Sequence, residues 1–128
     1  MTIHVKRAYD PPTPEDGCRV LVDRLWPRGL SKERAAVDEW LREVAPSTAL
    51  RRWFAHDPAR WGEFKQRYWE ELTGAAACEA VKRLRILAVT GEVTLLYAAK
   101  DEVHNNAVAL REYLASSQRR PSPVGWGE

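Results

Sequence analysis

The sequence predicts a single α/β domain, in which a small, mainly parallel sheet is flanked by helices in a three-layer sandwich. Three observations lead to this prediction. The chain has 128 residues, enough for one domain with its own apolar core. Two short apolar runs, 18–25 and 92–98, have the composition of strands that are buried on both faces. Segments with helical spacing lie between these runs, so the two strands can pair in parallel through a crossover.

A further strand is expected near the N-terminus, over 2–7, because Ile3 and Val5 alternate there with polar residues. The next segment, YDPPTPEDG, contains three prolines and is expected to be a surface loop. The strand over 18–25 ends at the segment WPRGL, in which Pro27 disfavours helical backbone at the residue before it.

Helix starts are indicated by Ser31, by Ser47 and by the pair Asp57–Pro58, since Ser and Asp cap helix N-termini and proline is favoured in the first turn. In the helix that Asp57 begins, four large residues fall on one stripe: Trp61, Phe64, Tyr68 and Leu72. The expected helices cover 31–36, 47–56, 57–73, 75–90 and 107–117.

Two segments are less regular. DEWLREVA, residues 38–45, has apolar residues at helical spacing, which favours a helix, but VDEWLREV also fits a strand. The segment 119–128 is too rich in proline and glycine for regular structure. The domain is therefore expected to cover 1–118, with an irregular C-terminal tail over 119–128.

The charge balance does not favour a nucleic-acid or membrane surface. The formal net charge is only +2, and the sequence has no long basic stripe with interleaved aromatic residues. No apolar run reaches the roughly 18 residues of a membrane helix, and the N-terminus lacks the apolar region of a signal peptide. The expected compartment is therefore the cytoplasm.

Cysteine and histidine are too sparse to indicate a metal site. Cys18 and Cys78 lie far apart and are expected to be free, buried thiols, although sequence alone leaves a disulfide open. The three histidines, at positions 4, 56 and 104, are scattered along the chain. No cofactor is expected.

Two loops follow the carboxyl ends of the buried strands, where ligands bind in open α/β sheets. The first, DRLWPRG over 23–29, contains Arg24 and Arg28, whose planar guanidinium groups suit phosphate or carboxylate. Trp26 lies between them and can stack on a ring. The structural alternative is that Arg24 pairs with a carboxylate such as Asp23, and that Trp26 closes the core.

The second loop comes directly before the last helix, where backbone N–H groups and amide side chains suit a negative charge. Capping of the helix by Asp101, Asn105 or Asn106 explains the same residues without a ligand. Arg51 and Arg52 could form a basic rim, but solvated helix charges are the commoner case. The predicted ligand-binding residues are Arg24, Trp26, Arg28, Lys100, His104, Asn105 and Asn106.

Three residues are candidates for moving protons: Asp23 at the end of its strand, His56 between two helices, and Asp101. The neighbouring Asp57 is explained as a helix cap. The sequence contains none of the motifs of hydrolase triads, zinc proteases, dinucleotide-binding folds or P-loops. It therefore indicates no particular reaction.

Three blocks of the sequence resemble the domain of unknown function 488 family, in its YeaO-like branch. They are RVLVDRLWPRG, then WLREVAPS with LRRWFAHDP, then TLLYAAKDEVHNNA. The resemblance extends from Ile3 to about Leu114. It implies an α/β domain near the rhodanese–phosphatase type of fold, a cytoplasmic bacterial protein, and a functional cleft formed by the two loops described above.

The sequence departs from other branches of that family at one point. Those branches resemble LLC-A-E-K-D with a later Cys-His-Arg, and in that type of fold a cysteine at the end of a strand attacks the substrate. Here the strand ends in Tyr97, and the later segment reads His104-Asn105-Asn106. A tyrosyl oxygen, with an ordinary pKa of about 10, is a poor replacement for a thiolate. Covalent sulfur or phosphoryl chemistry is therefore not expected.

Three functions remain open. The first is non-covalent binding of a small anionic ligand, phosphorylated or nucleotide-like, between the loops 23–29 and 100–106. The second is an enzyme that uses general acid–base chemistry on an anionic substrate. The third is a protein-interaction domain, with self-association through exposed tryptophans; the candidates are Trp53, Trp61, Trp69 and Trp126. The first two functions need the two loops to meet in space.

Overall fold

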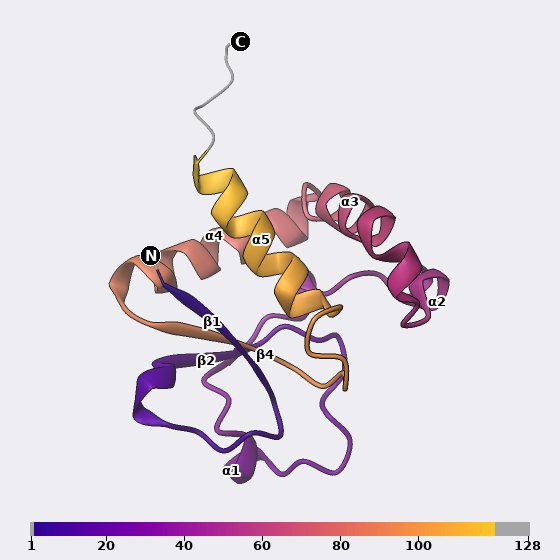
Figure 1. Ribbon diagram of the computed structural model, residues 1–128. Helices are drawn as coiled ribbons and strands as arrows, with labels where there is room; N and C mark the ends of the chain where they lie inside the picture. Colours follow the sequence, from indigo (N-terminus) through magenta and orange to yellow (C-terminus); the bar gives the residue numbers. More distant parts are fainter. Residues whose placement is uncertain (1, 120–128) are drawn as a thin grey trace.

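The structure is a computed structural model, which describes residues 2–119 and the side chains of residues 2–116. Within that part of the chain, four parallel strands form one sheet, which is flanked by helices (Figure 1). The strands are β1 (Ile3–Arg7), β2 (Cys18–Leu21), β3 (Glu39–Trp40) and β4 (Val93–Tyr97), in the order β1-β4-β2-β3. The predicted α/β fold with a parallel sheet is confirmed.

Helices and short 3-10 turns make up the rest of the regular structure between residues 2 and 119. The α-helices are α1 (Lys32–Ala35), α2 (Thr48–Phe54), α3 (Trp61–Glu71), α4 (Ala75–Thr90) and α5 (Asn106–Arg119). The 3-10 turns are η1 (Pro14–Asp16), η2 (Arg42–Val44) and η3 (Pro58–Arg60). The C-terminal tail and its Trp126 lie outside the described residues.

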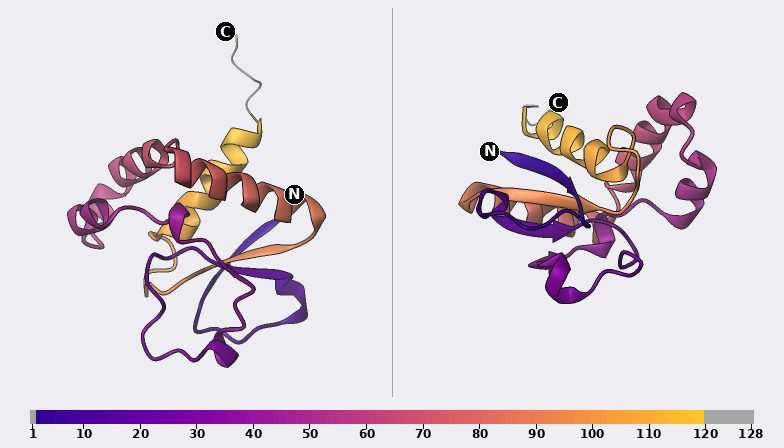
Figure 2. Two further views of the ribbon diagram at one scale, coloured as in Figure 1. Left: turned by 180° about the vertical axis from the view of Figure 1, so that it is seen from behind. Right: turned by 60° about the horizontal axis from the view of Figure 1, so that its bottom comes forward.

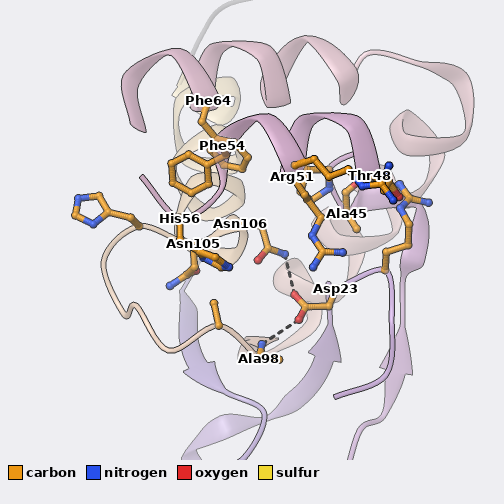
Figure 3. Close-up of a pocket in the computed structure, with 15 residues that line it drawn as sticks. Asp23, Ala45, Thr48, Arg51, Phe54, His56, Phe64, Ala98, Asn105 and Asn106 are labelled. Carbon is orange, nitrogen blue, oxygen red and sulfur yellow. Dashed lines mark hydrogen bonds between the residues drawn. The ribbon is translucent and has the colours of Figure 1, made fainter. Parts of the chain in front are cut away.

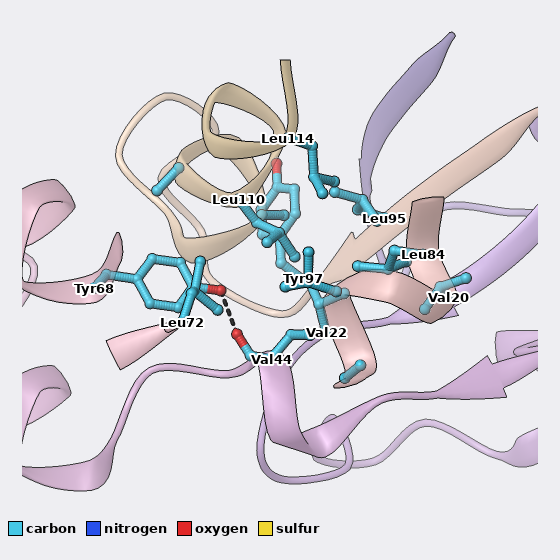
Figure 4. Close-up of a cluster of buried hydrophobic side chains, with 14 of the residues drawn as sticks. Val20, Val22, Val44, Tyr68, Leu72, Leu84, Leu95, Tyr97, Leu110 and Leu114 are labelled. Atoms are coloured by element: carbon cyan, nitrogen blue, oxygen red, sulfur yellow. Dashed lines mark hydrogen bonds between the residues drawn. The ribbon is translucent and has the colours of Figure 1, made fainter. Parts of the chain in front are cut away.

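An apolar core lies on each face of the sheet, and β4 is therefore buried along its whole length. Alternate residues of a strand point to opposite faces. Leu95 and Tyr97 belong to the larger core, where they pack with Leu84 of α4 and with Leu110 and Leu114 of α5 (Figure 4). The sheet and the helices α4 and α5 therefore share one apolar core.

The opposite face of the sheet is covered by α1 and the chain around it (Figure 2). Leu21 and Leu96 point to this side and pack with Leu30 and Ala35. Trp26 and Trp40 are packed against this cluster and meet edge to face, with ring centroids 5.5 Å apart. Trp26 therefore closes the smaller core, as the structural interpretation of that residue proposed.

The predicted helix caps are present, with one difference. The side-chain oxygens of Ser31 and Ser47 accept hydrogen bonds from the backbone N–H groups of Arg34 and Leu50. Asp57 also accepts a hydrogen bond, from the N–H of Ala59, but it caps the 3-10 turn η3. The α-helix predicted from residue 57 begins only at Trp61.

The segment 38–45 is neither the predicted helix nor a long strand. Glu39 and Trp40 form the edge strand β3, which pairs with Val20 and Leu21 of β2, and the 3-10 turn η2 follows. The strand predicted over 18–25 ends at Leu21. One more backbone hydrogen bond follows, from the N–H of Val22 to the carbonyl of Leu96, and the carboxylate of Asp23 then accepts the N–H of Ala98.

A buried group of charges lies at the start of β2. Asp16 and Arg19 are 4% and 3% exposed, and a carboxylate oxygen of Asp16 accepts a hydrogen bond of 2.6 Å from Nη1 of Arg19. Lys6 donates to both oxygens of Asp16 at 3.0 Å, and Arg19 also donates to the carbonyl of Ala35. The ionised groups of this cluster thus find partners within the protein.

Candidate functional site

A cavity of about 460 Å³ lies at the carboxyl end of the sheet (Figure 3). It is formed by the residues that follow β2 and β4, by α2, and by the first residues of α5. Its position matches the general rule for ligand sites in open α/β sheets, and its volume is in the range of small-molecule sites. The lining residues are Asp23, Arg24, Ala45, Pro46, Thr48, Arg51, Arg52, Phe54, His56, Phe64, Ala98, Ala99, His104, Asn105 and Asn106.

Asp23 joins the two loops at the floor of the cavity. One carboxylate oxygen accepts a hydrogen bond of 2.9 Å from the N–H of Ala98, and the other accepts one of 3.0 Å from Nδ2 of Asn106. The same amide of Asn106 donates to the carbonyl of Val22 at 3.0 Å. Burial raises the pKa of Asp23, against the lowering effect of these two hydrogen bonds and of the charge of Arg51.

Three arginines line the cavity that contains this carboxylate. Arg24 follows β2 and donates from Nη2 to the carbonyl of Ala45 at 3.1 Å, while its Nε is buried without a hydrogen-bond partner. Arg51 and Arg52 come from α2 and are exposed. Figure 3 shows the guanidinium group of Arg51 directed toward Asp23. The charged groups of the lining are therefore mainly cationic.

The remaining walls of the cavity are largely apolar. Phe54 of α2 and Phe64 of α3 are stacked, with ring centroids 4.4 Å apart. Ala98 and Ala99 follow β4 and complete this side. Because Phe54 and Phe64 are also part of the larger core, their positions are fixed by the packing of α2 and α3.

The loop before α5 is held by its own side chains. Asp101 accepts hydrogen bonds from the N–H groups of Val103 and His104, and its second oxygen lies 3.0 Å from Nδ1 of His104. These three contacts lower the pKa of Asp101 to about 2. The ring of His104 meets Trp61 edge to face, with centroids 5.4 Å apart. Asp101 is therefore an anion that orients His104.

Asn105 caps the first turn of α5. Its side-chain oxygen accepts a hydrogen bond of 2.9 Å from the N–H of Val108, and its Nδ2 donates to the carbonyl of Asp101 at 2.9 Å. Both ends of the amide thus have partners within the chain. The capping interpretation explains Asn105, and the amide of Asn106 is likewise engaged by Asp23 and Val22.

The structure brings together residues from both predicted loops. Among the predicted site residues, those that line the cavity are Asp23, Arg24, His56, His104, Asn105 and Asn106. Of these, His56 lies at the rim, and Figure 3 shows its imidazole directed away from Asp23 and Arg51. The hydrogen bond between Asp23 and Asn106 connects the two loops directly.

The other predicted residues are not part of the lining. Trp26 donates from Nε1 to the carbonyl of Leu30 within the smaller core. Arg28 and Lys100 are exposed, and Asp101 contacts His104 without lining the cavity itself. The loop 23–29 thus reaches the cavity with its first two residues and turns away afterwards.

The residues that α2 contributes are not among the predicted binding residues; Arg51 and Arg52 were considered only as a basic rim, with solvated helix charges as the commoner case. Arg51, Arg52 and Thr48 lie on the first turns of this helix, and Phe54 ends it. Their helical position was predictable from the Ser47 cap. Their approach to the carboxyl end of the sheet was not, because it depends on how α2 and α3 pack together.

The predicted tryptophan surface is largely occupied by neighbouring side chains. Trp53 lies beneath the guanidinium groups of Arg60 and Arg67, at 5.1 and 4.3 Å from the ring centroid. Trp69 donates from Nε1 to the carbonyl of Ala109 at 2.9 Å. Self-association through tryptophan stays a prediction.

Tyr97 ends β4 at the position that the family resemblance singled out. It is 3% exposed and belongs to the larger core, and burial raises the pKa of its hydroxyl. It does not line the cavity. Cys18 and Cys78 are both free and partly buried, and neither lines the cavity.

The fold and the cavity define a small α/β protein with a ligand-sized cleft at the carboxyl edge of a parallel sheet. A family model described as the inactive DUF488-N3 subclade matches residues 2–123, and the chain belongs to this family. The predicted membership is thereby confirmed.

Relatives in two groups of bacteria match almost the whole chain. The chain is 44% identical to the uncharacterized protein YeaO of Escherichia coli over 116 residues, which is 91% of this chain and 99% of YeaO. It is 40% identical to the uncharacterized protein Rv3073c of Mycobacterium tuberculosis over 112 residues, 88% of this chain and 92% of that protein. No solved structure matches the chain.

No helix between residues 2 and 119 has the length and apolar character that crossing a membrane requires. In the same part of the chain, no group of three or more His, Cys, Asp or Glu side chains is arranged to hold a metal ion.

Proposed function

We propose that the cavity binds a small anionic ligand without forming a covalent bond to it. The observation that carries this proposal is the grouping of Arg24, Arg51 and Arg52 around one cavity that contains a single carboxylate, Asp23. Guanidinium groups bind carboxylate and phosphate through paired, charge-assisted hydrogen bonds. A cationic lining of this kind favours an anion over a neutral or cationic ligand.

All three of these arginines have donors that the described part of the chain does not use. Arg51 and Arg52 donate no side-chain hydrogen bond to any described residue, and Arg24 uses Nη2 alone, for the carbonyl of Ala45. An anion that pairs with the exposed Arg51 and Arg52 binds the native state and thereby stabilises it.

The family supports binding rather than catalysis. The matching model carries the description "inactive", and the strand that leads to the cavity ends in a buried tyrosine rather than a thiol. A pocket can keep its recognition groups after the reacting group is lost, because binding and bond-breaking depend on different atoms.

The test is ligand-dependent stabilisation, with one arginine changed inside the cavity and one outside it. Melting temperature and heat of binding are measured with inorganic phosphate, acetate, benzoate and adenosine monophosphate, for wild type, Arg51→Gln and Arg28→Gln. At least one anion is expected to raise the melting temperature of wild type and of Arg28→Gln. The same anion should bind Arg51→Gln about tenfold more weakly, the loss of one charge-assisted contact.

Two results would contradict the proposal. The first is that none of these anions changes the melting temperature or releases heat. The second is that Arg28→Gln weakens binding as much as Arg51→Gln does, because Arg28 is exposed and does not line the cavity.

A second candidate function is acid–base catalysis on the bound anion. The specific observation is the pairing of His104 with Asp101 at the cavity, since a carboxylate on Nδ1 leaves Nε2 of the imidazole to accept a proton. If this function holds, a bound compound should be converted by wild type but not by His104→Gln, with binding retained in both. Proton NMR of the compound over time measures this, and an unchanged spectrum with wild type speaks for binding alone.

A further inference from the structure

Opposite charges face each other across the cavity without pairing. Figure 3 shows Asp23 below and the guanidinium group of Arg51 directed toward it from α2. Elsewhere in the described residues, acidic and basic side chains at close range form ion pairs, as Glu39 and Arg83 do. Asp23 and Arg51 are both described, yet no ion pair joins them, although the charge of Arg51 acts on the pKa of Asp23. Both residues line the cavity.

Asp23 can accept more than the hydrogen bonds it already has. A carboxylate offers about four acceptor sites. One oxygen receives the N–H of Ala98 and the other receives Nδ2 of Asn106, so roughly half of the capacity is used. These two contacts also fix the orientation of the carboxylate. A ligand N–H or O–H at the floor of the cavity would therefore find an acceptor already in position.

The same carboxylate disfavours ligands with several negative charges. Asp23 is partly buried, where repulsion between like charges is screened less than at the surface. A di- or triphosphate would place further negative charge near it. An anionic group of one charge can instead contact Arg51 and keep away from Asp23.

The apolar wall of the cavity favours a ligand that has an apolar part. Ala98 and Ala99 are partly exposed there, and the nearly buried rings of Phe54 and Phe64, 6% and 2% exposed, add only their accessible edges to this apolar wall. A ligand that covers these atoms gains about 25 cal/mol for each Å² of apolar surface removed from water. An inorganic oxyanion would leave this wall uncovered.

We propose that the ligand is a small organic acid with an N–H or O–H donor beside its anionic group and an apolar remainder, as in α-amino and α-hydroxy acids. This inference rests on the proposed function and narrows its ligand class. The anionic group contacts Arg51 and Arg24, the donor contacts Asp23, and the apolar remainder lies against Phe54 and Phe64.

The test uses four compounds that share one phenyl skeleton and differ only in the two polar groups. They are L-phenylalanine, L-3-phenyllactate, 3-phenylpropanoate, which lacks the donor, and L-phenylalaninamide, which lacks the anion. Inorganic phosphate is the fifth probe. Dissociation constants are measured by calorimetry on the full chain.

Phenylalanine or phenyllactate is expected to bind about tenfold more tightly than 3-phenylpropanoate, the value of one hydrogen bond to a charged group. Phenylalaninamide should not bind.

The amino and hydroxy acids are distinguished in the same experiment. Tighter binding of phenylalanine indicates an ammonium group on ionised Asp23, and tighter binding of phenyllactate indicates a hydroxyl donor. Asp23→Asn should remove the advantage of the donor-bearing acid over 3-phenylpropanoate, whereas Arg51→Gln should weaken all acids alike. Arg28→Gln should leave every ratio unchanged.

The failures of the two proposals differ. If 3-phenylpropanoate binds as tightly as both donor-bearing acids, or if phosphate binds and the organic acids do not, the inferred ligand class is wrong and anion binding stands. If no anion binds, the proposed function itself is wrong. Should Asp23→Asn fail to fold, the ratios between the four compounds on the wild-type protein still decide the question.

Discussion

The protein holds two groups of Asp and Arg side chains, and they differ in how their charges are satisfied. At the start of β2, Asp16 and Arg19 form an ion pair of 2.6 Å, and both residues are nearly inaccessible to solvent. Beyond the carboxyl end of the same strand, Asp23 and Arg51 face one cavity without an ion pair between them. The short strand β2 thus separates a carboxylate that is paired with an arginine from one that is not.

The difference distinguishes structural charges from charges available to a ligand. Burial alone would raise the pKa of Asp16, but hydrogen bonds from the N–H of Thr13, from Lys6 and from Arg19 hold it well below its usual range. The pKa of Asp23 is raised by burial, which its fewer partners do not offset. A carboxylate whose charge is fully paired within the fold has a structural role. A carboxylate with fewer partners, such as Asp23, still has acceptor sites for a ligand.

The largest effect is expected from breaking the completed network. Arg19→Met removes the ion pair with Asp16 and the hydrogen bonds to Ala35, and leaves a buried carboxylate with Lys6 as its remaining cation. The free energy of unfolding should fall by about 3 kcal/mol, the lower end for a broken buried pair. Urea unfolding followed by tryptophan fluorescence measures this, with Arg34→Gln on the exposed side of α1 as control. A loss below about 1 kcal/mol would mean that the pair behaves as a surface pair does.

A smaller loss is expected where the cavity is held together. Asn106→Ala removes the amide that donates to both Val22 and Asp23, and so detaches the start of α5 from the end of β2. Unfolding free energy should fall by about 2 kcal/mol, because acceptors lose their donor in a partly buried place. Hydrogen exchange at the N–H of Ala98 should become faster, since its acceptor Asp23 is no longer fixed. Unchanged exchange there would show that Asp23 does not depend on Asn106.

The two carboxylates should respond to acid in opposite directions. The pKa of Asp16 is lower in the folded chain than in the unfolded chain, so its contribution is present above about pH 4 and is lost as the pH falls below that. The pKa of Asp23 is higher in the folded chain, so its contribution declines as the pH rises above about 4. One group changes stability by at most about 1.4 kcal/mol per pH unit.

Urea midpoints between about pH 5 and 2.5 test this prediction. Asp16→Asn should flatten the loss of stability toward low pH relative to wild type. Asp101, whose pKa is about 2, contributes in the same direction and remains in both proteins, so it cancels in the comparison. Equal slopes for the two proteins would contradict the assignment of Asp16.

The smallest effect is expected at Arg28, which sequence reasoning placed in the site and the structure places on the surface. Its side chain makes no hydrogen bond within the described residues, although its carbonyl accepts one from Tyr9. Arg28→Gln should therefore change the free energy of unfolding by less than about 0.5 kcal/mol. Differential scanning calorimetry would reveal a larger loss, which would mean that the guanidinium has a structural partner.

Features that depend on neighbours in the sequence were predictable. The strands at β1 and β4, the caps Ser31 and Ser47 and the helix α4 follow from apolar spacing and from residues that end or begin an element. The pair of loops at the carboxyl end of the sheet also followed, from the parallel pairing of β2 and β4. Each of these is decided within a few residues or by a general rule of sheet topology.

Features that depend on packing between distant segments were not predictable. Arg51 and Arg52 have the sequence pattern of solvated helix charges. The stacking of Phe54 on Phe64 and the hydrogen bonds between Ser47 and Glu71 hold their helix against α3 and so at the cavity. The segment 38–45 has helical spacing, but edge pairing with β2 and the contact between Trp40 and Trp26 favour a short strand. The amide of Asn106 is engaged by Val22 and Asp23, more than 80 residues earlier, a distance that local patterns do not reveal.

The sheet order has a consequence for how the chain acquires its structure. β4 lies between β1 and β2, so the two N-terminal strands have no contact as sheet neighbours until Val93–Tyr97 is in place. During synthesis, at about 5–20 residues per second, the first two strands would wait several seconds on the ribosome for their common partner. Folding then depends on loop closure over about seventy residues, which makes it slow for a chain of this size. A fragment that stops before Val93 is expected to contain at most the short pairing of β2 with β3, and β1 is left without a partner strand.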